Sequence, residues 1–133
     1  MLLGTLGLVL GASGVASAAI TLNGLDLGPD SPISAGQYRW VLQSADGNFV
    51  QYGPNGAVRA SFVVNEGVDR VAFQRTDCNV VGYAGATPKW ASLRTSPGAN
   101  GGCKFTFTND GRLVVTDPNG VQLWDFAEGV QRV

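Results

Sequence analysis

Two short polar segments, 31 residues apart, carry side chains that could bind a polyhydroxylated ligand. The first reads QSADGNFVQY from Gln43 to Tyr52, and the second reads QRTDCNVVGY from Gln74 to Tyr83. From the Asp onward the distinctive residues fall at every second position, and alternate residues of an extended strand share one face. A face with a carboxylate, an amide, a small aliphatic group and a phenol can hydrogen-bond hydroxyls while contacting C–H surface.

Each copy offers the same five candidate contacts. They are Gln43, Asp46, Asn48, Val50 and Tyr52 in the first copy and Gln74, Asp77, Asn79, Val81 and Tyr83 in the second. An ionised Asp accepts from two hydroxyls, an Asn amide both donates and accepts, and a Tyr hydroxyl can reach a further oxygen. The Val would pack on an apolar edge of the ligand, and the Gln would complete the ring of contacts.

A tight turn is the competing interpretation of the Asp residues. Asp-Gly is a leading hairpin dipeptide, and it occurs at Asp46-Gly47 and at Asp110-Gly111. In the second copy Cys78 stands where the Gly would be, and a positive φ is uncommon for a residue other than Gly. We therefore expect the Asp to belong to a strand with one polar face.

The composition favours a single binding domain over an enzyme. The chain has 133 residues, a net charge of −1, 14% charged residues and 19 Gly, which fits one all-β domain. The sequence shows no basic patch, so a nucleic-acid partner is not expected. It contains no His, which excludes a Ser-His-Asp triad. Asp46 and Asp77 should lie on separate sheets, unlike the carboxyl pair of a glycosidase. We expect no catalysis, no cofactor and no metal.

The N-terminal segment predicts export. Residues 1–18 carry no charge and end in Ala16-Ser17-Ala18, which fits a signal-peptide cleavage site and would leave a mature domain of residues 19–133. A membrane anchor is the alternative, weakened by Gly and Ser in this stretch. A secreted, extracellular protein without stable membrane insertion is expected. In that setting Cys78 and Cys103 favour a disulfide, whereas two free thiols would fit a cytosolic protein.

A repeat of about 32 residues organises the chain. Asp46, Asp77 and Asp110 head three similar stretches, 31 and 33 residues apart. An apolar run precedes each polar pattern, a Gly- or Pro-containing turn follows it, and Trp90 or Trp124 follows the second and third turns. Such a period predicts supersecondary units that share a core, each with room for about four short strands. Three small sheets around a pseudo-threefold axis are expected.

The two Trp residues are predicted to be core, because their neighbours are apolar and their repeat positions match. Counting seven residues past the Tyr places Arg59 in the corresponding position of the first repeat. A charged residue rarely lies buried without a partner. Either this corner is open to solvent or Trp40 or Phe62 fills it.

The pattern resembles the Q-x-D-x-N-x-V-x-Y motif of the monocot mannose-binding, or bulb-type, lectins. The resemblance spans about residues 33–124 and includes the segment after Asp77, Lys89-Trp90, Cys103 and Leu123-Trp124. It implies a β-prism II fold with three four-stranded antiparallel sheets, one sugar pocket per sheet and a disulfide between the two Cys. It also implies that Asp and Asn read the axial 2-hydroxyl of mannose. Relatives often pair by exchanging a C-terminal strand, so a homodimer is possible here.

The chain departs from that motif in two ways. Gln43 and Gln74 stand three residues before the Asp instead of two, so either a β-bulge returns them to the pocket or other groups replace them. The third copy has lost the Asn and the Tyr. Its five positions are Thr108, Asp110, Arg112, Val114 and Thr116. We expect Arg112 to pair with Asp110, leaving this copy silent for mannose.

The expected function is that of a secreted lectin that recognises mannose or mannose-containing glycans through two repeat pockets. The alternative is a lectin-fold protein that has lost mannose binding and serves as a protein-interaction or structural module, because function resides in the site and not in the scaffold.

Overall fold

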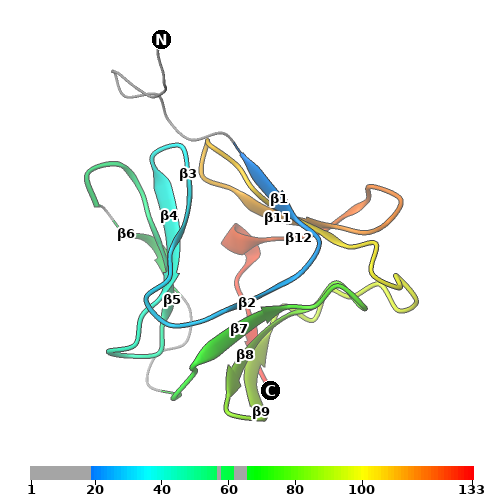
Figure 1. Cartoon of the computed structure of the whole chain (residues 1–133), viewed down its shortest axis with the longest axis horizontal. Coiled ribbons are helices and arrows are strands. Elements are labelled where there is room, and N and C mark those ends of the chain that lie inside the picture. Colours follow the sequence, from blue (N-terminus) through cyan, green and yellow to red (C-terminus); the bar gives the residue numbers. More distant parts are fainter. Residues whose placement is uncertain (1–18, 57, 62–65) are drawn as a thin grey trace.

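The computed structural model describes residues 19–56, 58–61 and 66–133, and within them the chain forms three antiparallel sheets. The first-repeat sheet runs in the order β3 (Ile33–Ala35), β4 (Tyr38–Leu42), β5 (Phe49–Tyr52), β6 (Val58–Ser61). The second-repeat sheet runs β13 (Gln131–Arg132), β9 (Thr87–Ala91), β8 (Val80–Ala84), β7 (Arg70–Phe73), β2 (Leu25–Leu27). The third-repeat sheet runs β1 (Ile20–Leu22), β10 (Lys104–Phe107), β11 (Leu113–Thr116), β12 (Gln122–Asp125). Figure 1 shows the three sheets arranged around a common centre.

Each repeat supplies three consecutive strands and not the four expected from its length. The N-terminal segment adds the remaining strand to every sheet: β3 pairs with β4, β2 with β7 and β1 with β10. In Figure 1 this segment, drawn in blue to cyan, passes along all three sheets in turn. The repeats are therefore joined by backbone hydrogen bonds to one shared segment as well as by the core.

The apolar runs before each polar pattern form strands as predicted. They correspond to β4, β7 and β10, and each pairs with the strand that carries the polar pattern. The pairing register shifts at the same point in every sheet, between Gln51 and Tyr52, between Gly82 and Tyr83, and between Val115 and Thr116. This shared irregularity confirms that the repeat is structural.

Aromatic side chains fill the centre between the sheets. Trp40, Trp90 and Trp124 are at most 1% exposed, which confirms that Trp90 and Trp124 are core residues. The ring of Phe73 contacts Phe49 of the first-repeat sheet with the ring centroids 6.2 Å apart. It also contacts Phe107 of the third-repeat sheet at 5.7 Å. These edge-to-face contacts join all three sheets.

The Trp position in the first repeat is Ala60, and the assignment to Arg59 was wrong. Gly82 pairs with Trp90 in the second-repeat sheet, and Gln51 pairs with Ala60 in the first. Counting from the Tyr failed because Tyr52 pairs with Val58 six residues later, whereas Tyr83 pairs with Pro88 five residues later, so the turn in the first repeat is one residue longer. Gly82 has no side chain, and an added Cβ there would overlap the Trp90 ring. Trp40 and Gln51 are both buried, whereas Phe62, the other residue considered for this corner, lies outside the described residues.

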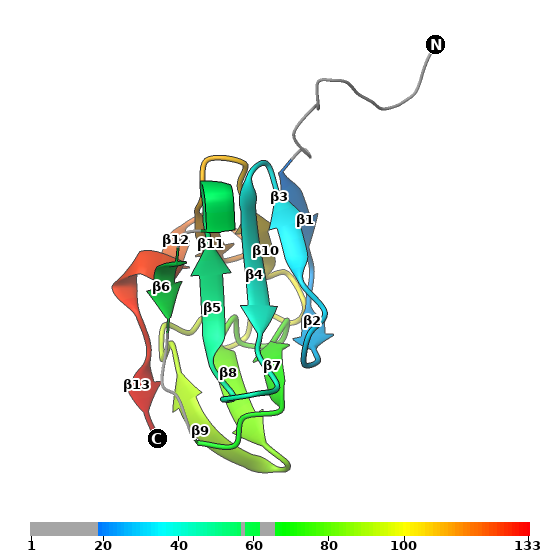
Figure 2. The same ribbon diagram turned by 90° about the vertical axis from the view of Figure 1, so that its left-hand side faces the viewer.

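The C-terminal segment returns to the second repeat. After β12, a short 3₁₀ helix (Phe126–Glu128) is capped by Asp125, whose side chain accepts from the Ala127 backbone amide at 3.0 Å. Strand β13 then pairs with β9, so the second-repeat sheet has five strands and not four. The other 3₁₀ helix (Pro54–Gly56) is the predicted Pro-Asn-Gly turn. In Figure 2 the C-terminus lies beside β9.

The disulfide between Cys78 and Cys103 is present, as predicted. It ties the hairpin turn of the second repeat to the loop before β10. The predicted signal peptide, residues 1–18, lies outside the described residues. No helix in the described part of the chain is long and apolar enough to cross a membrane.

Candidate functional site

The two Asp residues lie in hairpin turns and not in strands, contrary to the sequence-based expectation. The Gly47 amide donates to the Gln43 carbonyl, and the Cys78 amide donates to the Gln74 carbonyl, both at 2.8 Å. Gly47 has φ 65° and Cys78 has φ 67°, so Cys78 adopts the left-handed conformation that we expected it to avoid. Its bond to Cys103 fixes it in the turn.

Each Asp side chain folds back onto its own turn. Asp46 Oδ1 accepts from the Asn48 backbone amide at 3.0 Å, and Asp77 Oδ1 accepts from the Asn79 amide at 3.1 Å. Such Asx contacts stabilise the turn. The second carboxylate oxygen of Asp46 and of Asp77 has no partner within the described ranges, so it remains available to a ligand.

The extra residue before each Asp does not remove the Gln from the candidate site. Gln74 Nε2 donates to the Tyr83 hydroxyl at 2.9 Å, and Gln43 Nε2 makes the same bond to Tyr52. The turn absorbs the additional residue, because the amide of each Gln donates to the Asn carbonyl five positions later. No bulge before the Asp is needed. Gln, Asn and Tyr therefore lie on the same outward face of each hairpin.

Asn79 has a structural role that the sequence analysis missed. Its Oδ1 accepts from Ser92 Oγ at 2.9 Å and from the Leu93 amide at 3.0 Å. Ser92 Oγ in turn accepts from the Val80 amide at 3.2 Å. The amide oxygen is therefore engaged in joining β8 to the segment after β9, and the Nδ2 donor is what remains for a ligand. The sequence around Asn79 carried no local signal for this contact, because Ser92 stands 13 residues later and approaches through strand pairing.

Val50 and Val81 lie on the outward face but are only 3% and 4% exposed. Because they are covered by their neighbours, these two Val side chains offer little apolar surface to a ligand. Their neighbours on the other face, Phe49 and Val80, point into the core. The alternation predicted from the sequence is thus present from the Asn onward.

An Arg covers the Tyr in both copies. Arg39 lies over the Tyr52 ring, with its guanidinium carbon 4.7 Å from the ring centroid, and Arg70 lies over Tyr83 at 4.2 Å. Each Arg is the cross-strand partner of its Tyr, and such stacking holds the ring in place. Arg70 also pairs with Asp26 at 3.4 Å. The signal was in the sequence, because each Arg stands four residues before its Gln.

Open clefts adjoin both hairpin turns. A cleft of about 430 Å³ lies beside Asp46 and extends to Pro29, Val68 and Asp69. Another of about 430 Å³ lies beside Gln74 and extends to Gly24 and Asp26. Of the candidate contacts, Asp46 lines the first cleft and Gln74 lines the second.

The third copy is built differently. Arg112 does not pair with Asp110 as expected: its Nη2 lies 2.8 Å from Asp125 Oδ2 and its Nε donates to the same oxygen at 2.9 Å. Asp110 accepts from the Thr108 hydroxyl. Arg112 reaches across to β12 because Asp125 is the cross-strand partner of Val114 and so shares its outward face. Ala91 occupies that position in the second copy.

Among the described residues no three His, Cys, Asp or Glu side chains gather as a metal site. The candidate site consists of hydrogen-bonding groups on β-hairpins. It is suited to reading the hydroxyls of a ligand.

Neither a protein-family model nor a curated protein sequence matches the chain. Solved structures of lectins do match the chain. A structure of monomeric monocot mannose-binding lectins from Gastrodia elata matches with a TM-score of 0.69 and 22% identity, over 82% of this chain and 96% of that one. The Marasmius oreades lectin matches with a TM-score of 0.67 and 23% identity, over 82% of this chain and 89% of that one. The chain has the fold of the monocot mannose-binding lectins. This confirms the predicted β-prism, with three sheets around one core.

In this fold each repeat has three consecutive strands, and the polar pattern runs into the middle one, which is β5, β8 or β11. The first and second repeats keep the Gln, Asp, Asn and Tyr set on β-hairpins of equal length. The third hairpin is one residue shorter, because the Thr108 amide donates to the Arg112 carbonyl only four positions later. The two intact copies and the altered third copy thus differ in backbone as well as in side chains.

Proposed function

We propose that this chain is a carbohydrate-binding protein for mannose or mannose-containing glycans, acting through the first and second repeats. The observation that supports it most is the repetition of one hydrogen-bond set in two hairpins. In each, the Gln amide donates to the Tyr hydroxyl and the Asp carboxylate caps the turn. Such duplication is unnecessary for folding, because the third hairpin folds without it.

The groups that this arrangement leaves for a ligand match a sugar diol. In the second copy they are Asp77 Oδ2 and Gln74 Oε1 as acceptors, and Asn79 Nδ2 and the Tyr83 hydroxyl hydrogen as donors. None has a partner within the described part of the chain. Adjacent hydroxyls that each donate and accept could satisfy all four groups. By the resemblance, the Asp and Asn would read the axial 2-hydroxyl of mannose.

Each pocket should bind weakly alone, because a few hydrogen bonds contribute about 1 kcal/mol net apiece and association has its own cost. Two pockets per chain would gain strength on a multivalent glycan. The clefts beside Asp46 and Gln74 give room for neighbouring sugar units. Cross-linking of mannans on a cell surface fits this design.

We further propose that the protein is secreted and acts without catalysis. A disulfide and an apolar N-terminal segment support export. A homodimer would arise if β13 paired with β9 of a second chain instead of its own, and sedimentation velocity of the exported protein would distinguish the two states.

Retention on mannose-agarose tests the proposal. The wild-type protein should be retained and released by free mannose. Changing Asn48 and Asn79 together to Asp removes both Nδ2 donors while keeping an oxygen for the bonds that Asn79 accepts, so this variant should pass through. If the wild type itself passes through, the alternative of a protein-interaction or structural module is favoured.

A further inference from the structure

Each candidate sugar site contains a Tyr whose hydroxyl already accepts a hydrogen bond. Gln43 donates to Tyr52, and Gln74 donates to Tyr83. A hydroxyl that accepts from an amide can still donate its own hydrogen to a ligand. Both Tyr side chains are only half-buried, so neighbours on the outward face must hold the ring if that donor is to keep one direction.

The neighbour that covers each ring is an Arg on the preceding strand. Arg39 lies over Tyr52 with its guanidinium carbon 4.7 Å from the ring centroid, and Arg70 lies over Tyr83 at 4.2 Å. In both sheets the Arg is the direct cross-strand partner of the Tyr. A guanidinium over the face of a ring is attracted to it. The contact also restricts ring motion that a ligand would otherwise have to restrict on binding.

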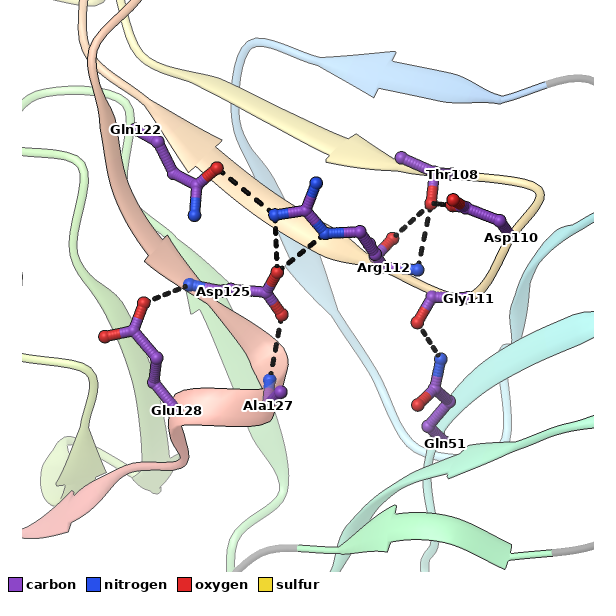
Figure 3. A network of polar contacts seen from close by, with 9 residues as sticks. All are labelled: Gln51, Thr108, Asp110, Gly111, Arg112, Gln122, Asp125, Ala127 and Glu128. Atoms are coloured by element: carbon purple, nitrogen blue, oxygen red, sulfur yellow. Dashed lines mark hydrogen bonds and ion pairs between the residues drawn. The ribbon is translucent and has the colours of Figure 1, made fainter.

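The third repeat shows that this strand position does not require an Arg. The corresponding pair there is Lys104 and Thr116, so the Arg and the Tyr are replaced together. The outward-facing Arg112 pairs instead with Asp125, beside a pocket of about 270 Å³, the third pocket, which Gln51 lines from β5 (Figure 3). An Arg stacked on a Tyr is thus a feature of the two hairpins that keep the polar set.

The two stacked Arg residues differ in what holds them. Arg70 Nη1 lies 3.4 Å from Asp26 Oδ1. Asp26 is on β2 and is the cross-strand partner of Ala72, two residues after Arg70, so both side chains share the outward face. In the first-repeat sheet the added strand is β3, which reads Ile-Ser-Ala and contains no carboxylate. Its Ser34 is the direct partner of Arg39.

We propose that Asp26 is a positioning residue of the second site and makes this site bind mannose more tightly than the first. The inference rests on the proposed function and deepens it, because it ranks the two sites. Asp26 holds Arg70 over Tyr83, so the phenol donor is in place before the sugar arrives. Arg39 has no carboxylate beside it on β3, which leaves more of the ordering to the moment of binding.

A mannose titration of the ¹⁵N-labelled full chain, followed at the side-chain amides of Gln43 and Gln74, measures each site separately. The Gln74 amide should reach half-saturation at a mannose concentration about two- to fivefold lower than the Gln43 amide, the range of an exposed cation–π contact. Equal midpoints, or a tighter first site, would overturn the ranking and leave mannose binding intact. If neither amide shifts, the proposed function fails and the ranking fails with it.

The Asp26→Asn variant keeps the shape of the side chain and removes the charge that holds Arg70. The second-site midpoint should rise about two- to fivefold, to about that of the first site, whose own midpoint should not change. Glu66→Gln is the matched control, because it makes the same charge change and removes the 2.8 Å ion pair with Arg132 at the opposite edge of the same sheet. An equal loss in both variants, or no loss in Asp26→Asn, contradicts the assignment.

A direct contact between Asp26 and the sugar must be separated from a role through Arg70, because Asp26 lines the cleft beside Gln74. In an Arg70→Gln background, Asp26→Asn should cause no further loss of affinity, since the side chain that it positions is gone. A further loss of the same size would mean that Asp26 contacts the ligand itself, and the positioning role would be wrong. The pair is exposed, so Asp26→Asn alone should leave the urea midpoint nearly unchanged.

The converse change tests the same role in the first repeat. Ser34 and Arg39 are direct cross-strand partners and both are exposed, so Ser34→Asp places a carboxylate within reach of the guanidinium. The first-site midpoint should fall about two- to fivefold, toward that of the second site. Ser34→Asn, which has a similar shape without the charge, should leave it unchanged. Equal first-site midpoints in these two variants would contradict positioning by the carboxylate.

Discussion

Cys78 adopts a backbone conformation that its residue type disfavours, with φ 67°, because it occupies the turn position that Gly47 occupies with φ 65° in the first copy. Residue-type preference therefore failed at Cys78, and with it the placement of Asp77 in a strand. The alternation of polar and apolar side chains was reliable from Asn79 onward, since it reflects which face of the strand is buried. The role of Asn79 Oδ1 could not be predicted, because Ser92 and Leu93 approach it only through strand pairing.

Gly82 tests the packing of Trp90 in the second-repeat sheet. A Cβ at this position would overlap the Trp90 ring, which is fully buried and cannot move outward. Gly82→Ala should lower the free energy of unfolding by about 2 kcal/mol, measured by urea denaturation. Gly28→Ala is the control, since its Cβ would meet nothing within 4 Å. Equal stability of the two variants would contradict the packing described.

The Asp30 carboxylate, beside the first hairpin, is expected to have a lowered pKa in the folded protein. The Ser44 side chain, and then the Ser44 backbone amide, hydrogen-bond this carboxylate and hold its pKa below the ordinary 3.8. A lowered pKa in the folded state means that the contact is fully present above pH 3.8 and is lost as pH falls through the folded pKa. NMR titration should give an Asp30 midpoint below 3.8. The Ser44→Ala variant removes the hydroxyl and keeps the backbone amide, so the midpoint should rise part of the way toward 3.8.

At the scale of elements, the hairpins and their strands were predictable, and the strand that completes each sheet was not. Periodic turns and apolar runs mark β4, β7 and β10, because these features are local in sequence. The short strands β1, β2 and β3 have no such repeat. They join three different sheets through pairings up to 87 residues apart in sequence, as between Ile20 and Phe107.

The disulfide should stabilise the second hairpin. It closes a separation of 25 residues, which constrains the unfolded chain by about 3 kcal/mol in the chain-entropy model. The Cys78→Ser, Cys103→Ser double variant should lose about that much in its free energy of unfolding, and a reductant should then have no further effect on it. Unchanged stability of the double variant would show that the turn is held by other contacts.

At the scale of the whole molecule, the threefold arrangement gives three hairpins that face outward in different directions around one core (Figure 1). Two keep the same side-chain set and one carries the Arg112–Asp125 pair. The fold was predictable from the repeat, because three amphipathic units of equal length have one efficient way to share a core. The altered third pocket could not be predicted from the sequence, because Gln51 reaches it from another repeat.

Two sites on one rigid core predict avidity. The wild-type chain should bind a branched mannan at least about a hundredfold more tightly than free mannose. Asn79→Asp, which leaves only the first site, should bind free mannose at half the stoichiometry and lose most of the gain on mannan. Surface plasmon resonance on immobilised mannan measures both. A gain that persists in the one-site variant would mean that the two hairpins do not act together.

The most direct measurement is a mannose titration of the labelled chain followed at the side-chain amides of Gln43 and Gln74. Two hairpins with the same Gln-to-Tyr hydrogen bond predict saturable shifts at both amides, displaced by neither glucose nor galactose at equal concentration. Shifts at neither amide, in a protein whose spectrum is that of a folded β-prism, would contradict mannose binding by these hairpins.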